Sequence, residues 1–200
     1  MLNMKTRQTY LKALGFYKGS VDGIEGPMTR TAYKSLQNKY FVRKSDKDGI
    51  YGNNTDILLQ NAYNVWRLCK NFTLPEFKCE CNGRYCTGYP KVLNTNLLTY
   101  LQSIRKSTGV ATVIASGLRC VTLNNKTPGA IKDSKHTKGK AVDFYSSKTT
   151  TLNSRKNIIN TYMKNRYATY AYCNNYYKSN IGSGYVNAPY MGTSIHIDVL

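Results

Sequence analysis

The sequence predicts an α+β fold in which a small helical domain precedes a domain of strands and helices. Two observations predict it. Residues 1–68 combine helical periodicity with a repeated turn, whereas residues 72–200 contain both amphipathic helical stretches and short β-branched or alternating segments. A hydrophobic content of 41% is typical of a globular chain. No apolar run approaches the roughly 20 residues that cross a bilayer, so we expect no transmembrane segment.

A short internal repeat organises the N-terminal domain. Residues 22–29 read DGIEGPMT and residues 48–55 read DGIYGNNT. Asp-Gly favours a tight turn, the second glycine of each copy permits unusual backbone angles, and Pro27 suits the first turn of a helix. Helical spacing follows each copy, and a further helix before the first copy ends at Gly15. The prediction is a three-helix domain over residues 1–68.

This N-terminal segment resembles a peptidoglycan-binding domain of the three-helix type. The resemblance rests on residues 9–17, which read TYLKALGFY, and on both repeated turns. It implies binding to the glycan or the stem peptide of the bacterial wall. The Asp-Gly pairs themselves are interpreted as turn formers rather than as ligand contacts.

The net charge of +19 favours a polyanionic partner. Nucleic acid, an anionic membrane surface and an anionic cell-wall polymer all fit that charge. We do not expect nucleic-acid binding, because the chain lacks a basic helix, an aromatic RNP-like strand and zinc-finger spacing.

Residues 1–8 lack the apolar core of a secretory signal, so we expect synthesis in the cytoplasm.

The predicted C-terminal domain follows a linker at residues 70–75, in which Thr73 is expected to cap a short helical turn. Its other predicted elements are a helix at 92–106, a buried strand at 110–115, a loop at 124–129, a strand at 141–145, a helix at 151–163, strands near 170–172 and 184–186, and a last strand at 194–199. The turn after the strand at 110–115 projects Arg119, whose guanidinium suits capture of a carboxylate, although a solvated surface charge is the simpler interpretation.

Four of the six cysteines form a candidate second metal site. Cys79, Cys81 and Cys86 lie close together in the sequence, and Cys120 follows a predicted turn further along. This group is interpreted as a structural zinc site with four thiolate ligands. Two alternatives stay open, namely reduced thiols packed in a core and a disulfide formed in an oxidising space.

Both histidines of the chain lie beside carboxylates in patterns that predict a metal site. His136 and Asp143 are separated by Gly139, where the chain can turn back. In the last strand, period-two alternation places His196 and Asp198 on one face and the apolar residues on the other. Two imidazoles and one carboxylate are a common ligand set for catalytic zinc, with one position left for water. We therefore predict that His136, Asp143 and His196 hold a Zn²⁺ ion.

The pattern S-x-H-x-x-G-x-A-x-D at residues 134–143, with H-I-D at 196–198 and S-G-L-R at 116–119, resembles the zinc D-Ala-D-Ala peptidase family. That family shares a small antiparallel-sheet α+β fold with the hedgehog signalling domain and includes phage endolysin peptidases. The resemblance covers residues 72–200. Within the family, the sequence looks closest to the D-alanyl-D-alanine carboxypeptidase/endopeptidase branch, which carries a cysteine-rich N-terminal segment. It implies that His136, Asp143 and His196 bind zinc and that Arg119 holds a substrate carboxylate or carbonyl.

The general base departs from the family pattern. Many relatives carry Glu or Asp three residues before the final histidine, or His two before it, where this chain has Thr193 and Ser194. Because no third histidine exists, a carboxylate must serve. Asp198 is the candidate catalytic base, since it shares a strand face with His196. An equal alternative is that Asp198 does not act as the base but orients the imidazole of His196 without binding the metal itself.

The resemblance implies hydrolysis of an amide bond in the peptidoglycan stem or cross-link, such as a D-Ala-D-Ala-type or L-Ala-D-Glu bond. Together with the wall-binding module it leads us to expect a monomeric phage endolysin that acts on the bacterial cell wall, with anionic wall polymers as a further partner. A bacterial wall-remodelling D,D-carboxypeptidase is the nearest alternative. A non-catalytic cell-wall-binding protein is the alternative from a different class.

Overall fold

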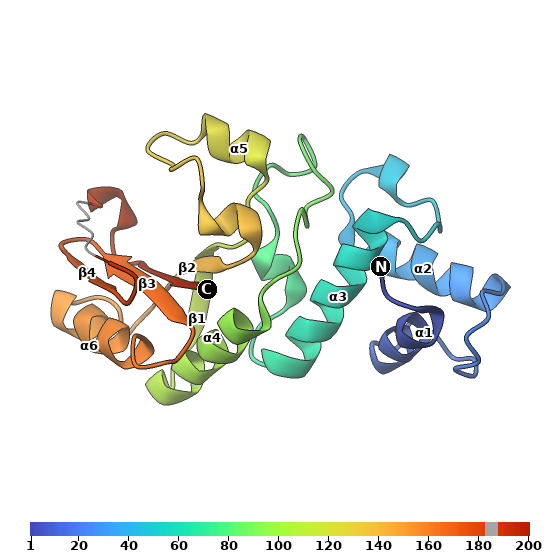
Figure 1. Ribbon diagram of the computed structural model, residues 1–200, viewed down its shortest axis with the longest axis horizontal. Coiled ribbons are helices and arrows are strands. Elements are labelled where there is room, and N and C mark those ends of the chain that lie inside the picture. The colour runs from blue at the N-terminus through green and yellow to red at the C-terminus, as the bar shows by residue number, and fades with distance from the viewer. Residues whose placement is uncertain (183–187) are drawn as a thin grey trace.

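The computed structural model of the protein describes residues 1–182 and 188–200. Helices form the N-terminal third, and a five-stranded antiparallel sheet with helices forms the remainder, as Figure 1 shows. The α+β class predicted from the sequence is therefore confirmed. The helical region and the sheet lie at opposite ends of an elongated molecule, with α3 and α4 packed against each other between them (Figure 1).

The secondary structure alternates along the chain as the sequence patterns indicate. The helices are α1 (Met4–Ala13), α2 (Pro27–Tyr40), α3 (Asn53–Leu68), α4 (Thr95–Thr108), α5 (Val121–Lys126) and α6 (Leu152–Tyr162). The strands are β1 (Thr112–Ser116), β2 (Ala141–Ser146), β3 (Ala168–Cys173), β4 (Tyr176–Ser179) and β5 (Ile195–Val199). Short 3₁₀ helices are η1 (Lys44–Asp46), η2 (Leu74–Phe77), η3 (Lys135–Lys138) and η4 (Pro189–Met191). No helix in the described ranges is long and apolar enough to cross a membrane.

The repeated turns lead into α2 and α3. Gly26 caps α2 with a φ of −102°, which is ordinary extended backbone, so the conformational freedom of the second glycine is not used there. The first glycine carries the positive φ instead, +85° at Gly23 and +81° at Gly49. An N-cap needs only extended geometry, whereas the Asp-Gly reversal needs the left-handed region.

A buried glutamine on the preceding helix forms hydrogen bonds with each turn. The amide nitrogen of Gln8 donates to Asp22 Oδ1 at 2.7 Å and to the carbonyl of Ile24 at 3.0 Å, and its oxygen accepts from the amide of Gly23 at 2.8 Å. Gln37 makes the same bonds to the second copy of the turn. Both glutamines are completely buried. The turn residues therefore bond within the fold, which agrees with their interpretation as turn formers.

The helical region packs directly on the sheet domain through α3. Asn61, fully buried on α3, donates to the carbonyl of Lys91 at 2.9 Å and accepts from the amide of Leu93 at 2.7 Å. One apolar core runs through both regions. In the connecting segment, the Glu76 carboxylate accepts from the amide of Thr73 at 2.6 Å, so Thr73 begins a short helical turn as expected.

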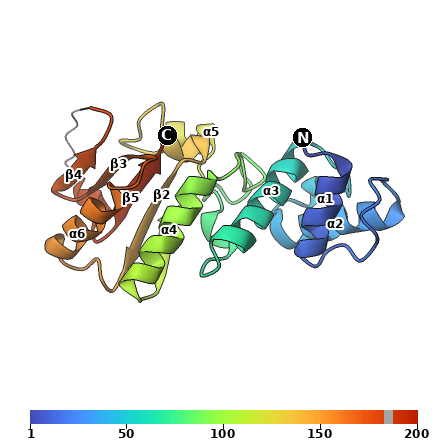
Figure 2. The same cartoon turned by 60° about the horizontal axis from the view of Figure 1, so that its bottom comes forward.

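The sheet has the order β1-β2-β5-β3-β4, with every neighbouring pair antiparallel. β5 is thus the central strand. Its residues Ile195, Ile197 and Val199 are fully buried, and α4 and α6 cover the same face of the sheet, as Figure 2 shows. The alternate residues of β5, His196 and Asp198, therefore point to the opposite face.

Several expected elements differ from those observed. β1 is an edge strand with Val113 43% exposed, so the expectation of a buried strand is wrong. The expected loop at 124–129 begins inside helix α5, and β4 was not anticipated. The predicted strand near residues 184–186 lies outside the described residues. Short elements such as α5 and β4 show too few turns of periodicity to be read from the chain.

Candidate metal centre

The three predicted metal ligands come from three different elements and meet at one place. His136 lies in η3, Asp143 on β2 and His196 on β5. The antiparallel pairing of β2 and β5 places Asp143 directly opposite His196. One ligand atom from each of the three residues lies within 4.8 Å of the other two. The backbone register and the η3 turn thus bring together side chains that are up to 60 positions apart.

Gly139 makes the turn that joins His136 to Asp143. Its φ is +70°, and a Cβ at this position would lie 2.2 Å from the carbonyl oxygen of Val92. The carbonyl of Gly139 also accepts from the amide of Asn94 at 2.8 Å. The left-handed backbone and the close approach together explain why a residue without a side chain stands here.

We expect Gly139→Ala to lower the free energy of unfolding by about 2–4 kcal/mol, from left-handed strain plus a backbone clash. Gly129→Ala is the matched control, since Gly129 has a φ of +72° and none of the described residues comes within 4 Å of the added Cβ. The control should cost only about 1–2 kcal/mol, the strain alone. Chemical denaturation of both variants measures the difference. Equal losses would contradict a role for the Val92 contact.

The ring of His136 is held so that one nitrogen remains available to a metal. Its Nδ1 lies 2.8 Å from the carbonyl oxygen of Gly117 and must donate there, because a carbonyl only accepts. Its Nε2 lies 3.4 Å from Asp143 Oδ2 and 3.3 Å from His196 Nδ1. This backbone bond fixes the tautomer and turns the Nε2 lone pair towards the other two residues.

His196 lies between two carboxylates. Its Nδ1 is 2.7 Å from Asp143 Oδ1, and its Nε2 is 3.4 Å from Asp198 Oδ2. The other oxygen of Asp198 accepts a hydrogen bond from Thr169 Oγ1. The ring of Tyr172 stacks on the imidazole with 4.5 Å between ring centroids. His196 therefore presents Nδ1 to His136 and Asp143 and turns Nε2 to Asp198.

The centre is electrostatically suited to a cation. Burial by itself raises the pKa of Asp143, but its close contacts with the imidazoles of His136 and His196 outweigh burial and hold that pKa well below its usual range. Burial by itself lowers the pKa of His196, but hydrogen bonds to Asp143 and Asp198 outweigh it and raise the pKa to about 9. The carboxylates thus stabilise positive charge here, and two imidazole nitrogens plus one carboxylate oxygen fit a zinc ion.

The three residues line a cavity of about 550 Å³. Arg119 lines it too, and its backbone amide donates to the carbonyl of His136 at 3.3 Å while its guanidinium donates to Ser116 Oγ at 3.3 Å. Arg119 is thus half-buried beside the candidate metal centre rather than a solvated surface charge.

Further residues line the same cavity. Tyr170, Tyr172 and Tyr190 face the cavity, and so does the carboxylate-bearing Glu80. Glu80 lies next to Cys79, whose Sγ accepts from the amide of Cys120, so its loop lies beside the turn that carries Arg119. No signal in the local sequence indicates this placement. The four cysteines predicted as ligands of a second metal ion also lie together, with their Sγ atoms all within 4.8 Å of one another.

Comparison with protein families gives two matches. The family described as Peptidase M15 matches residues 70–179, and the family described as "Putative peptidoglycan binding domain" matches residues 2–56. No curated protein matches the chain. The first match includes His136 and Asp143 but ends before β5, so the place of His196 in the centre rests on geometry. Since this match covers more than half of the chain, the protein belongs to the zinc-dependent Peptidase M15 family.

Proposed function

We propose that this M15 peptidase is an endolysin-type peptidoglycan hydrolase that uses zinc to cleave one amide bond of the stem peptide or cross-link, such as a D-Ala-D-Ala-type or L-Ala-D-Glu bond. The observation that carries the proposal is the convergence of His136, Asp143 and His196 within 4.8 Å along a cavity shared with Arg119. The peptidoglycan-binding match at residues 2–56 supports the substrate.

We divide the chain into a wall-binding domain at residues 1–68 and a catalytic domain at residues 72–200. The first domain holds the enzyme on its insoluble substrate and so raises the local substrate concentration. The net charge of +19 supports attraction to anionic wall polymers, an attraction that salt weakens. Binding and cleavage are thereby assigned to separate parts of one chain, which acts as a monomer.

In the proposed mechanism His136 Nε2, Asp143 and His196 Nδ1 would hold the zinc ion. When bound there, zinc lowers the pKa of a coordinated water and polarises the scissile carbonyl. Arg119, fixed by Ser116, donates to a carboxylate or carbonyl of the peptide and stabilises developing negative charge. The buried bond from His136 to Gly117 keeps the ring oriented through the reaction.

The proton-transfer group is a carboxylate of the cavity. Asp198 lines the cavity, but its Oδ2 faces His196 Nε2 and its Oδ1 accepts from Thr169, which supports a positioning role for it. If Asp143 is a ligand and Asp198 orients His196, Glu80 is the remaining carboxylate among the described residues that line the cavity. Asp198 and Glu80 as the proton-transfer group predict different kinetics for the corresponding variants.

Purified peptidoglycan tests the proposal. The full-length protein should release soluble peptides, lose this activity in a zinc chelator and regain it when zinc is restored. Mass spectrometry of the muropeptides identifies the bond that is cut. A chelator-insensitive reaction, or none at all in protein that carries zinc at the centre, would contradict the proposal.

The products also separate the alternatives. Release of free D-alanine alone, with cross-links intact, would identify a wall-remodelling D,D-carboxypeptidase. Co-sedimentation with peptidoglycan without release of any product would identify a non-catalytic wall-binding protein. We expect instead internal cleavage that solubilises the wall, observed as loss of turbidity in a peptidoglycan suspension.

A further inference from the structure

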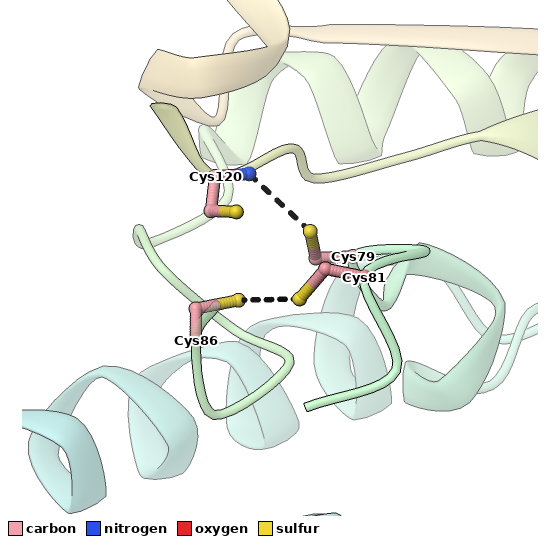
Figure 3. A group of neighbouring side chains, drawn as sticks. All are labelled: Cys79, Cys81, Cys86 and Cys120. Atoms are coloured by element: carbon pink, nitrogen blue, oxygen red, sulfur yellow. Dashed lines mark hydrogen bonds between the residues drawn. The ribbon is translucent and has the colours of Figure 1, made fainter. Parts of the chain in front are cut away.

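Four cysteines enclose a small space beside the catalytic cavity. Cys79 and Cys81 lie on the segment after η2, Cys86 lies where that loop returns, and Cys120 precedes α5. Figure 3 shows the four sulfur atoms turned towards a common centre from three stretches of chain. From this arrangement we propose that Cys79, Cys81, Cys86 and Cys120 bind a structural zinc ion as four thiolates.

The separations of the sulfur atoms fit one tetrahedral ion. A Zn–S bond of about 2.3 Å requires sulfur atoms about 3.8 Å apart in a tetrahedron. The Sγ atoms of Cys81 and Cys86 are 3.4 Å apart, and all four lie within 4.8 Å of one another, so the required value falls inside the observed range. The 3.4 Å separation is also too long for a disulfide, which needs about 2.05 Å.

Backbone amides point at the sulfur atoms as they do towards thiolates. The amide of Cys120 donates to Cys79 Sγ at 3.3 Å, the amide of Gly88 to Cys86 Sγ at 3.4 Å, and the amide of Leu123 to Cys120 Sγ at 3.4 Å. Sulfur accepts hydrogen bonds weakly as a thiol and more strongly as an anion. Three of the four sulfurs are thus provided with donors that favour the deprotonated, metal-binding form.

The loop that carries three of the cysteines is irregular. Residues 78–88 contain no helix or strand. The buried cluster there consists of Cys79, Cys81 and Cys120, with Tyr85, Cys86 and Leu123 packed against it, and it is separate from the main apolar core. Because so small an apolar cluster contributes little to the stability of the loop, a metal ion bound by four thiolates would stabilise it further.

Two basic side chains near the cluster would partly offset the two negative charges of a zinc ion with four thiolates. Arg84 and Lys126 line the same surface hollow as Cys81, together with one acidic residue, Glu80. A Cβ added at Gly83 of this loop would lie 3.1 Å from Val42 and 3.2 Å from Arg43. The cluster therefore lies where the loop meets the N-terminal region.

The site would also brace one wall of the catalytic cavity. Cys120 directly follows Arg119, and the amide of Leu118 donates to the carbonyl of Phe77 at 2.9 Å. Glu80, between two of the thiols, lines the cavity. The ion would thus tie the Glu80 loop to the turn that carries Arg119 and the carbonyl that orients His136.

Counting zinc in the full-length protein tests this proposal. After dialysis against metal-free buffer, inductively coupled plasma mass spectrometry should find two zinc ions per chain, and one in Cys81→Ser. The matched control is Cys69→Ser, which removes a buried thiol outside the cluster and should keep two. His196→Ala should keep one. If the native protein has one and His196→Ala none, the cysteine site is refuted and the catalytic site stands.

Two further measurements do not depend on the fold of a variant. Replacement of zinc by Co²⁺ in the native protein should give an intense thiolate-to-cobalt charge-transfer absorption, which the catalytic ligands alone cannot produce. In denaturant with chelator, all six thiols should react with a thiol reagent. Absence of the absorption, or two unreactive cysteines that indicate a disulfide, would overturn the proposal.

Discussion

Replacing His136 with alanine should abolish hydrolysis of peptidoglycan by the purified protein. The variant loses a metal ligand whose Nε2 faces both Asp143 and His196, and the remaining two donors cannot retain zinc firmly. Because the ion supplies several kcal/mol of transition-state stabilisation, we expect the rate to fall by about 10³-fold or more. Zinc content should fall by one ion per chain.

Release of soluble muropeptides measures this effect, with zinc counted in the same sample. Lys138→Ala is the control, since Lys138 belongs to the same 3₁₀ helix but pairs with the exposed Asp133, at 2.6 Å. The control should retain both activity and zinc. Unchanged activity in His136→Ala would remove His136 from the centre, and a loss of activity with zinc content unchanged would argue against its role as a ligand.

Asp198→Asn should weaken zinc binding by about 10–100-fold, because the carboxylate that orients a metal-bound imidazole is lost. Asp198 Oδ2 lies 3.4 Å from the far nitrogen of His196, whereas Nδ1 of that ring faces Asp143. If Asp198 only positions His196, saturating zinc should restore kcat to near its native value. Activity measured across a zinc titration separates affinity from turnover.

The opposite outcome would identify Asp198 as the base. In that case kcat stays about 10²–10⁴-fold low even at saturating zinc, as expected when a general base is removed. Glu80→Gln, measured in parallel, tests the other carboxylate of the cavity. Low kcat in Glu80→Gln with recovery in Asp198→Asn would assign proton transfer to Glu80. The same defect in both would mean that the two carboxylates share it.

Helices with several turns of apolar periodicity were predictable from the chain. The stripes after each DGI turn became α2 and α3, and the stretches at 92–106 and 151–163 became α4 and α6. Long periodic segments specify their own structure because each turn repeats the same preference. The burial of β1 was not predictable, since an edge strand and a central strand of the same composition differ only in their neighbours.

The role of the two buried glutamines was likewise not predictable from the sequence. Gln8 and Gln37 appear as unremarkable polar residues within helices, and only the folded chain shows that they bond to the two Asp-Gly turns. Glu80 is a comparable case, because its cavity is formed mainly by residues far from it in sequence. Such roles depend on long-range contacts, for which no local pattern exists.

The side chains that could hold a metal ion were predictable from the sequence. Histidine occurs only twice, each time beside a carboxylate, and the alternation of β5 placed His196 and Asp198 on one face. Residue chemistry and period-two geometry are local properties and can be read from neighbouring positions. The α+β class followed from the same kind of local signal.

How these groups face one another depends on the tertiary fold. Pairing of β2 with β5 sets Asp143 opposite His196, the Gly117 carbonyl fixes the tautomer of His136, and the loop before α4 closes three cysteines onto Cys120. Each of these contacts joins residues dozens of positions apart. Their distances depend on strand register and on packing across the whole domain, and neither is specified by any short stretch of chain.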